Sequence, residues 1–210
     1  MRARRYGTEA TFVDELAPGE PAMLREVLLA AFAAADVQVR DVVPAAETLV
    51  VTHDSADTVA VAHVIAECSR TLAPLKLERV DDMAPVVEIP VRYDGEDLRS
   101  VADICSLSVD EVITLHADAD YRVEFCGFAP GFAYLRGLPA VLNVPRRPAP
   151  RSRVPAGSVA IAAEYSAVYP RESPGGWHLL GTTSLVMWDA ARASPATLVP
   201  GTRVRFVKVE

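Results

Sequence analysis

The sequence has few cysteines, and none is spaced as a disulfide partner or a metal ligand would be. Its three cysteines, Cys68, Cys105 and Cys126, are odd in number and far apart, and no CxxC pair occurs. The four histidines are equally scattered, without the local spacing that zinc sites use. We therefore expect free, mostly buried thiols, and we predict no metal site and no disulfide framework.

Other absences narrow the possible functions. No apolar run approaches the ~20 residues that a membrane-spanning helix needs. The basic start at Met1–Arg5 is followed by acidic residues in place of an apolar stretch, so we read no signal peptide and expect a cytoplasmic location. The net charge of −7 disfavours general nucleic-acid binding, and we expect neither nucleic acid nor membrane as a partner. No GxxxxGK[ST] phosphate-binding loop occurs.

The apolar content is high enough for a substantial folded core. Half of the 210 residues are apolar, which suits one large or two small domains. The segment Asp81–Pro85 has the composition of a linker or domain boundary. We predict one domain over residues 1–83 and a second over residues 84–210.

The first domain alternates strand-like and helix-like segments. Strands are predicted at Ala10–Val13 and Thr48–Thr52, and a helix is predicted from Glu20, with Pro21 in its first turn. A second helix follows Asp54-Ser55, with apolar residues recurring at helical spacing. The order strand, helix, strands, helix, strand is typical of a split βαβ domain of ferredoxin type.

The second domain is dominated by strand and turn signals. Apolar and polar residues alternate around Val87–Tyr93, Tyr121–Phe125 and Arg203–Phe206, and glycine or proline interrupts the chain at short intervals. A capping box, Ser108 with Glu111, predicts the start of one short helix. The pattern favours a β-barrel or sandwich with long loops.

A loop rich in aromatic residues is the first candidate site. It runs from Phe125 to Leu135 and contains Phe128, Phe132 and Tyr134 between glycine and proline residues. Glycine permits close backbone approach and proline stiffens the loop, so the rings could form the wall of a site for a small ring-shaped substrate. Alternatively, the same rings plug one end of a barrel.

The second candidate is an arginine-rich segment in an otherwise acidic chain. Prolines hold Val144–Ser158 extended, and the segment carries Arg146, Arg147, Arg151 and Arg153. Guanidinium groups bind carboxylate or phosphate in a bidentate manner, so an anion site or an acidic partner surface is one hypothesis. The other is that these arginines pair with nearby Asp and Glu residues.

The third candidate follows Tyr169 and contains a tight Pro-Gly-Gly turn. The backbone amides of Gly175 and Gly176 could bind an anion, and Trp177 could stack on a ligand or cap the core. His178 is a possible acid or base, because the pKa of free histidine lies near neutrality. A structural role for His178 is the alternative.

These loops carry a family resemblance. The segments GFAPGFAYL, PRRPAPRSRVPAGSVAIA, YPRESPGGWHLLGTT and PGTRVRF resemble the allophanate hydrolase subunit 1 family. The resemblance is strong from about Pro85 to Val207 and fainter before that. It implies an α+β fold, with an N-terminal ferredoxin-like domain followed by a C-terminal cyclophilin-like β-barrel.

The resemblance also implies a function within a complex. It suggests the B-type component of an ATP-dependent 5-oxoprolinase, which opens a lactam to glutamate together with a related C-type component and an A-type component. ATP with Mg²⁺ is implied for the complex, and no biotin for this chain. A lactam amide is a poor electrophile, so phosphorylating its oxygen with ATP would activate its carbon, in a step that needs cations.

Other functions remain open within this family. The chain could be an interaction module that inhibits a histidine kinase, or a component of a urea or allophanate pathway. Where the family often has Gly-Ser-Gln, this sequence has Ala163-Glu164-Tyr165, which adds a charge near the presumed pocket. Glu164 and His178 are therefore the two candidate catalytic residues.

Overall fold

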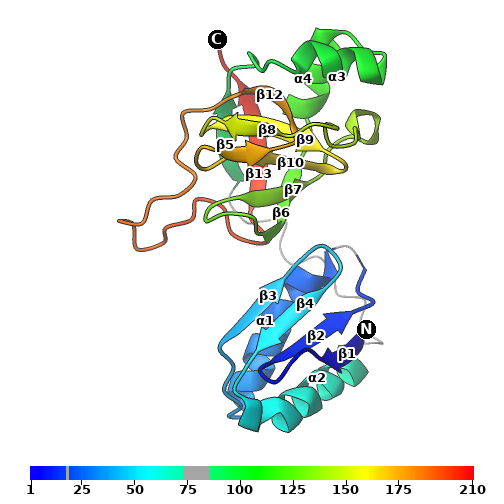
Figure 1. Ribbon diagram of the computed structural model, residues 1–210, viewed down its shortest axis with the longest axis vertical. Coiled ribbons are helices and arrows are strands. Elements are labelled where there is room, and N and C mark those ends of the chain that lie inside the picture. The colour runs from blue at the N-terminus through cyan, green and yellow to red at the C-terminus, as the bar shows by residue number, and fades with distance from the viewer. Residues whose placement is uncertain (18, 73–85) are drawn as a thin grey trace. The chain divides into compact units, whose positions relative to one another are not determined.

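The computed structural model describes residues 1–17, 19–72 and 86–210 (Figure 1). The chain divides into two compact units, Met1–Asp82 and Met83–Glu210, which are considered separately below. The predicted boundary between residues 83 and 84 lies outside the described residues. The assignment of separate domains to residues 1–83 and 84–210 therefore stays a prediction.

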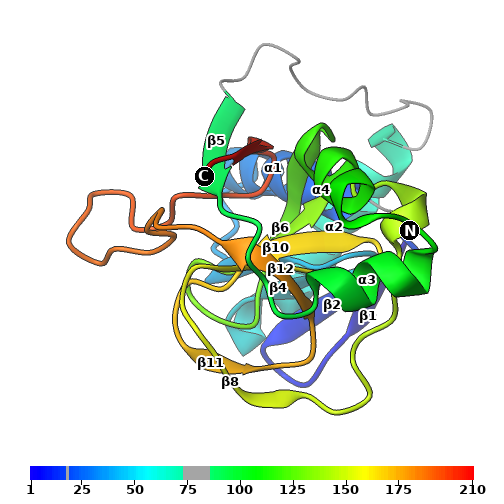
Figure 2. The ribbon, with the colours of Figure 1, turned by 90° about the horizontal axis from the view of Figure 1, so that it is seen from above.

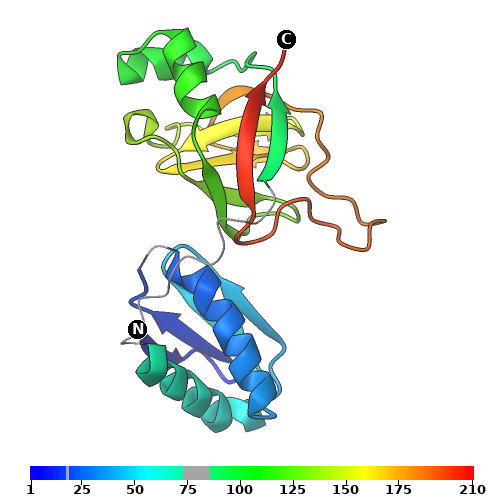
Figure 3. The ribbon, with the colours of Figure 1, turned by 180° about the vertical axis from the view of Figure 1, so that it is seen from behind.

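The N-terminal unit is a sheet with helices packed on one face. Its described strands pair in the order β1-β2-β4-β3 and are β1 (Arg2–Arg5), β2 (Ala10–Asp14), β3 (Asp41–Pro44) and β4 (Leu49–Thr52). Its helical segments are α1 (Glu20–Ala34), the 3-10 turn η1 (Ser55–Asp57) and α2 (Thr58–Leu72). Figures 1 and 3 show α1 and α2 on the same face of the sheet, where Leu28, Phe32 and Val61 help to form a buried core.

The connections of this unit follow the predicted ferredoxin-like pattern. Because β4 pairs antiparallel with both β2 and β3, those two strands are parallel, and α1 links them across β4. The edge strand beside β2 is β1, which the sequence analysis did not predict. The strand predicted after the second helix would follow Leu72, outside the described residues.

The C-terminal unit is built around a nearly closed barrel, which confirms the predicted α+β class. The described strands of its main sheet pair in the order β12-β9-β10-β7-β6-β13-β5. They are β5 (Val86–Val91), β6 (Tyr121–Cys126), β7 (Ala133–Arg136), β9 (Ser158–Ala162), β10 (Tyr165–Val168), β12 (His178–Thr182) and β13 (Arg203–Lys208). A separate pair consists of β8 (Arg151–Val154) and β11 (Ser173–Gly175).

Backbone hydrogen bonds bring the two ends of the main sheet together. The amide of Arg92, just after β5, donates to the carbonyl of Thr182 at 2.9 Å, and the Thr182 amide donates back at 2.8 Å. A side chain at Gly181 would place its Cβ only 2.3 Å from the Arg92 carbonyl oxygen. Glycine at this position therefore permits the close approach that closes the barrel.

Helices and long connections decorate the barrel. The helical segments are α3 (Leu98–Cys105), α4 (Val109–Ala117) and the 3-10 turn η2 (Ala140–Leu142). The predicted capping box is confirmed, because Ser108 and Glu111 each bond the other's backbone amide. Figure 2 shows the connection between β12 and β13 extending away from the barrel.

The free thiols are confirmed, and Cys68 is buried while Cys105 and Cys126 are partly exposed. None of the helices in the described ranges has both the length and the apolar character needed to cross a membrane.

A buried polar chain joins α4 to the barrel. The imidazole of His116 is fully buried, with Nδ1 2.8 Å from the Tyr93 hydroxyl and Nε2 2.9 Å from the Ser166 hydroxyl. The His116 ring also packs 4.5 Å from the Phe206 ring, centroid to centroid. Burial lowers the pKa of His116 to about 3, so the imidazole is neutral in the folded protein near neutral pH.

This histidine should make the stability of the C-terminal unit depend on pH. The pKa of His116 falls from 6.5 to about 3 on folding, so the unfolded chain binds more protons between these values. The contribution is fully present above pH 6.5 and is lost as the pH falls toward 3. The limiting slope is about 1.4 kcal/mol per pH unit.

We expect His116→Gln to lower stability at neutral pH and to flatten this pH dependence. Urea unfolding at several pH values from neutral to moderately acidic would measure the free energy of unfolding. The exposed His63 provides the control, and His63→Gln should retain the wild-type slope. Equal slopes in His116→Gln and the wild type would show that His116 does not control this dependence.

Candidate small-molecule site

Small residues on two strands create room for a layer of aromatic rings. Ala160 and Ala162 of β9 and Ala167 of β10 are buried in one cluster with several rings. The rings of that cluster are Phe132, Tyr169 and Trp177. Phe132 meets Tyr169 at 5.3 Å and Trp177 at 5.6 Å between centroids, both edge to face. This geometry is favourable for aromatic pairs and holds the rings rigidly.

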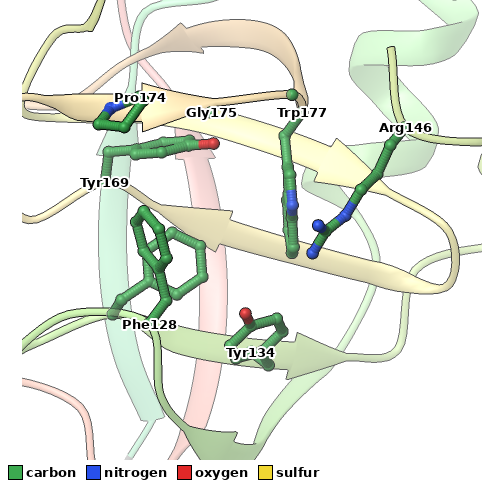
Figure 4. A pocket seen from close by; sticks show the side chains of 9 residues that line it. Phe128, Tyr134, Arg146, Tyr169, Pro174, Gly175 and Trp177 are labelled. Atoms are coloured by element: carbon green, nitrogen blue, oxygen red, sulfur yellow. The ribbon is translucent and has the colours of Figure 1, made fainter. Parts of the chain in front are cut away.

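A pocket of about 60 Å³ opens above this layer (Figure 4). It joins the three segments that the sequence analysis singled out, and it is lined by Phe128, Phe132, Tyr134, Arg146, Tyr169, Pro174, Gly175, Gly176 and Trp177. The structure thus brings together seven of the predicted binding residues, namely Phe128, Phe132, Tyr134, Arg146, Gly175, Gly176 and Trp177. That they bind a ligand stays a prediction.

The loop before β7 presents an exposed aromatic ring at the pocket. Phe128 is 58% exposed and has a φ of 69°, a left-handed conformation that is unusual for a bulky residue. The Phe132 amide donates to the Ala129 carbonyl at 3.0 Å, which closes the loop. At Gly131, with φ of 81°, an added Cβ would lie 2.7 Å from the Cβ of Trp188. Strain of this kind clusters at functional sites.

The polar edge of the pocket is formed by a cation and two phenols. The guanidinium carbon of Arg146 lies 6.0 Å from the Trp177 ring centroid. Figure 4 shows the guanidinium beside the ring, with the Tyr134 hydroxyl directed toward it. Burial raises the pKa of Tyr134, and a hydrogen bond from Arg146 and its positive charge partly offset this. Both phenols therefore stay protonated at neutral pH, since burial also raises the pKa of Tyr169.

A glycine is needed where Tyr169 meets the Pro-Gly-Gly turn. A Cβ at Gly175 would lie 2.1 Å from the Tyr169 hydroxyl oxygen, so any larger residue would displace the ring. At Gly176, by contrast, an added Cβ would make only ordinary contacts, the nearest at 3.6 Å. The Arg147 amide donates to the Gly176 carbonyl at 2.8 Å, which ties the turn to the arginine segment.

A buried carboxylate anchors the arginine segment. Asp97 is 3% exposed, and its Oδ1 accepts from Arg147 at 2.5 Å and from Arg151 at 2.9 Å. Its Oδ2 accepts from the Leu179 amide of β12 at 2.8 Å. Burial alone would raise the pKa of Asp97, but hydrogen bonds from Arg151 and the Leu179 amide, with the charges of both arginines, hold it below its usual value.

Three of the four arginines are thus paired with carboxylates. Arg147 and Arg151 share Asp97, Arg151 also reaches Glu96 at 3.2 Å, and Arg153 pairs with Glu172 at 2.5 Å. The ion-pair alternative describes these three. Their charges are compensated locally, so the hypothesis of four arginines gathered around one anion is wrong. Arg146 is the member of the group that lines the pocket.

The two candidate catalytic residues do not line the pocket. His178 is buried, and its Nε2 donates to the Pro145 carbonyl at 3.0 Å, which fixes the ring against the arginine segment. Glu164 lies in the turn between β9 and β10 and accepts from Arg136 at 2.9 Å. Neither geometry supports a catalytic role at this pocket, and both residues stay untested as catalysts.

Sequence reasoning missed several residues around the site. Tyr169 and Pro174 line the pocket although only their neighbours were selected. The buried Glu124 accepts from the Tyr165 hydroxyl at 2.5 Å, and Tyr165 packs 5.7 Å from the Tyr134 ring. Asp97 gave no local signal, because its partners lie 50 or more residues away in sequence. The Tyr-Pro-Arg-Glu-Ser-Pro-Gly-Gly motif itself could have indicated Tyr169.

The pocket does not suit a nucleotide triphosphate. Its volume of about 60 Å³ is far below the ~300 Å³ or more of typical ligand pockets. Three of the four arginines are already neutralised by carboxylates. Over residues 1–17, 19–72 and 86–210, no group of three or more His, Cys, Asp or Glu residues is arranged to hold a metal ion.

Comparisons with known proteins give matches over most of the chain. The family model for the carboxyltransferase domain, subdomain C and D, matches residues 1–198. The B-type component of 5-oxoprolinase from Escherichia coli O157:H7 is 49% identical over 133 residues, which are 62% of this chain and 61% of the relative. The protein of the same name from Bacillus subtilis (strain 168) is 45% identical over 127 residues, 59% of this chain and 53% of the relative.

Solved structures share the fold. TTHA0988 is 36% identical with a TM-score of 0.79, and the match covers 96% of this chain and 40% of that chain. Kluyveromyces lactis urea carboxylase is 16% identical with a TM-score of 0.76, covering 99% of this chain and 22% of that one. The second likeness concerns the fold alone. In both structures the matched region is part of a much longer chain.

Two arginines of the same segment should differ sharply in their effect on stability. Arg151 is mostly buried and pairs with the buried Asp97, whereas Arg153 is 75% exposed in its side chain. We expect Arg151→Ala to lower the free energy of unfolding by about 3 kcal/mol, because it leaves part of a buried charge uncompensated. Arg153→Ala should cost less than ~1 kcal/mol. Urea unfolding measures both, and equal losses would contradict the assigned anchoring role of Arg151.

Proposed function

Because this chain belongs to the family of the carboxyltransferase domain, subdomain C and D, we propose that it acts as the B-type component of an ATP-dependent 5-oxoprolinase complex. The complex converts 5-oxoproline to L-glutamate. Two relatives with 45–49% identity, each named as the B-type component of 5-oxoprolinase, support this proposal. The chain spans between half and two thirds of those relatives, so activity, substrate and partners are all part of the proposal.

The observation that carries the proposal is a cation set in an aromatic pocket. The substrate has a flat lactam ring and one carboxylate. Phe128 and Trp177 supply ring faces at the pocket, and Arg146 supplies a guanidinium beside them. The ring packs against the aromatic walls, and Arg146 binds the carboxylate. The Tyr134 hydroxyl, which Arg146 contacts, donates to a substrate oxygen.

The chain contributes binding, and partner chains contribute the remaining chemistry. The pocket of about 60 Å³ encloses only part of a lactam acid, so a second surface completes the site. ATP does not fit this pocket, and we assign ATP and Mg²⁺ to the partners, a C-type and an A-type component. This chain orients the lactam and excludes water from one side of it, which favours attack at a fixed carbon.

Reconstitution tests the function directly. The chain alone should release no glutamate from 5-oxoproline, and the mixture with its A-type and C-type partners should release it in step with ADP. Urea and allophanate serve as matched substrates, and neither should be turned over. An intact complex that leaves 5-oxoproline unchanged would refute the proposal, and inhibition of a histidine kinase by that complex would favour the interaction-module alternative.

Arg146→Ala should impair binding of the substrate far more than it impairs folding. A charged hydrogen bond contributes about 1.5–3 kcal/mol, so KM should rise roughly 10- to 100-fold while thermal stability changes little. Arg153→Ala is the matched control from the same segment, because Arg153 is exposed and pairs with Glu172, and it should leave KM unchanged. An equal effect of the two substitutions would remove Arg146 from the site.

Phe128→Ala provides a separate test of the aromatic wall. Phe128 is 58% exposed, so its loss should raise KM severalfold without unfolding the unit. Phe132 is a poor choice for this test, because it is 2% exposed and its truncation would cost about 3–5 kcal/mol of stability. Steady-state kinetics of the reconstituted complex gives the result, and an unchanged KM in Phe128→Ala would exclude contact with the substrate.

A further inference from the structure

The arginine segment holds one cation at the pocket while its neighbours serve another purpose. Arg146 and Arg147 are adjacent in sequence, yet Arg146 lines the pocket and Arg147 turns to the buried Asp97. The orientation of Arg146 therefore depends on what fixes the backbone on either side of it. The structure shows two such restraints on the C-terminal side: the Arg147 amide bonds the Gly176 carbonyl, and its guanidinium bonds Asp97.

Asp97 is the point where these restraints converge. Its two carboxylate oxygens join the arginine segment, through Arg147 and Arg151, to the Leu179 amide of β12. The Asp97 amide in turn donates to the Leu179 carbonyl at 3.1 Å, so the residue is held on both its backbone and its side chain. Leu179 is two residues after Trp177, whose ring lies beside the Arg146 guanidinium. One carboxylate thus connects both sides of the Arg146–Trp177 contact.

We propose that Asp97 is a positioning residue, which sets the direction of Arg146 and so determines the affinity of the pocket for a carboxylate ligand. The proposal rests on the proposed function for the identity of that ligand. Its structural part, the effect of Asp97 on the contact between Arg146 and Trp177, is independent of any ligand.

Electrostatics and positioning predict opposite effects of the same substitution. Removing the charge of Asp97 makes the region more positive and frees Arg147 and Arg151, so simple charge attraction would strengthen the binding of an anion. If Asp97 positions Arg146, Asp97→Asn weakens that binding instead. We expect KM for 5-oxoproline to rise about 10-fold in the reconstituted complex, in line with loss of a charged hydrogen bond. A KM that falls or stays the same would overturn the proposal.

Asp97→Asn could fail to fold, since it disrupts a buried ion-pair network. Arg147→Lys is the second variant, because it keeps the charge but loses the forked geometry that contacts Asp97. Arg147 is 31% exposed in its side chain, so this change is milder. Two matched controls are available: Arg153→Lys makes the same substitution at an exposed position, and Glu96→Gln removes the exposed second carboxylate partner of Arg151.

The emission of Trp177 gives a readout that needs no ligand. The chain has two tryptophans, so the measurement is made in a Trp188→Phe background. Arg146→Ala defines the spectral change that follows loss of the guanidinium from the ring. Asp97→Asn and Arg147→Lys should reproduce most of that change, and Arg153→Lys and Glu96→Gln should not.

The two measurements separate failure of this inference from failure of the proposed function. If the folded variants keep the wild-type Trp177 spectrum, Asp97 has only a structural role and the inference is refuted. If the spectra change as expected but no complex turns over 5-oxoproline, the proposed function fails and the positioning role stands.

Discussion

The buried carboxylate of Asp97 is the interaction on which the rest of the site depends. It lies at the start of α3 and bonds two arginines and one backbone amide, each from a different part of the chain. An ionised group is stable in such a position only when hydrogen bonds and opposite charge replace the water that it has lost. The network therefore fixes the extended arginine segment against β12. That placement brings Arg146 to the aromatic layer and leaves Arg153 in solvent.

Apolar spacing predicted the fold well because spacing is a local property. The strands around Ala10–Val13 and Tyr121–Phe125 and the capped helix after Ser108 all form where alternation or capping chemistry indicated. The edge strand β1 was missed because its residues, Arg2–Arg5, are exposed and mostly charged, with no apolar face to detect. Such a strand forms because β2 offers it backbone partners, which no periodicity reveals.

The candidate site was only partly predictable, for a different reason. The aromatic residues and Arg146 stand in unusual local sequences, and those sequences identified seven of the residues that line the pocket. Which arginine would remain without a carboxylate depended on Asp97 and Glu172, and spacing in the sequence says nothing about such pairing. His178 shows the same limit, since its chemistry suggested catalysis whereas its hydrogen bond to the Pro145 carbonyl makes it a brace for the segment.

The division between paired and ligand-facing groups explains how a small pocket can be selective. Its walls are rings held edge to face, and the small side chains of β9 and β10 beneath them leave the rings no space to rearrange. The cation at its edge loses little freedom on binding, because its neighbour Arg147 is already anchored. A site of about 60 Å³ cannot enclose a whole substrate, so its contribution is orientation of one end of the molecule. Rigid orientation on one chain leaves the reacting atoms exposed to another, which is the arrangement expected when binding and chemistry belong to different polypeptides.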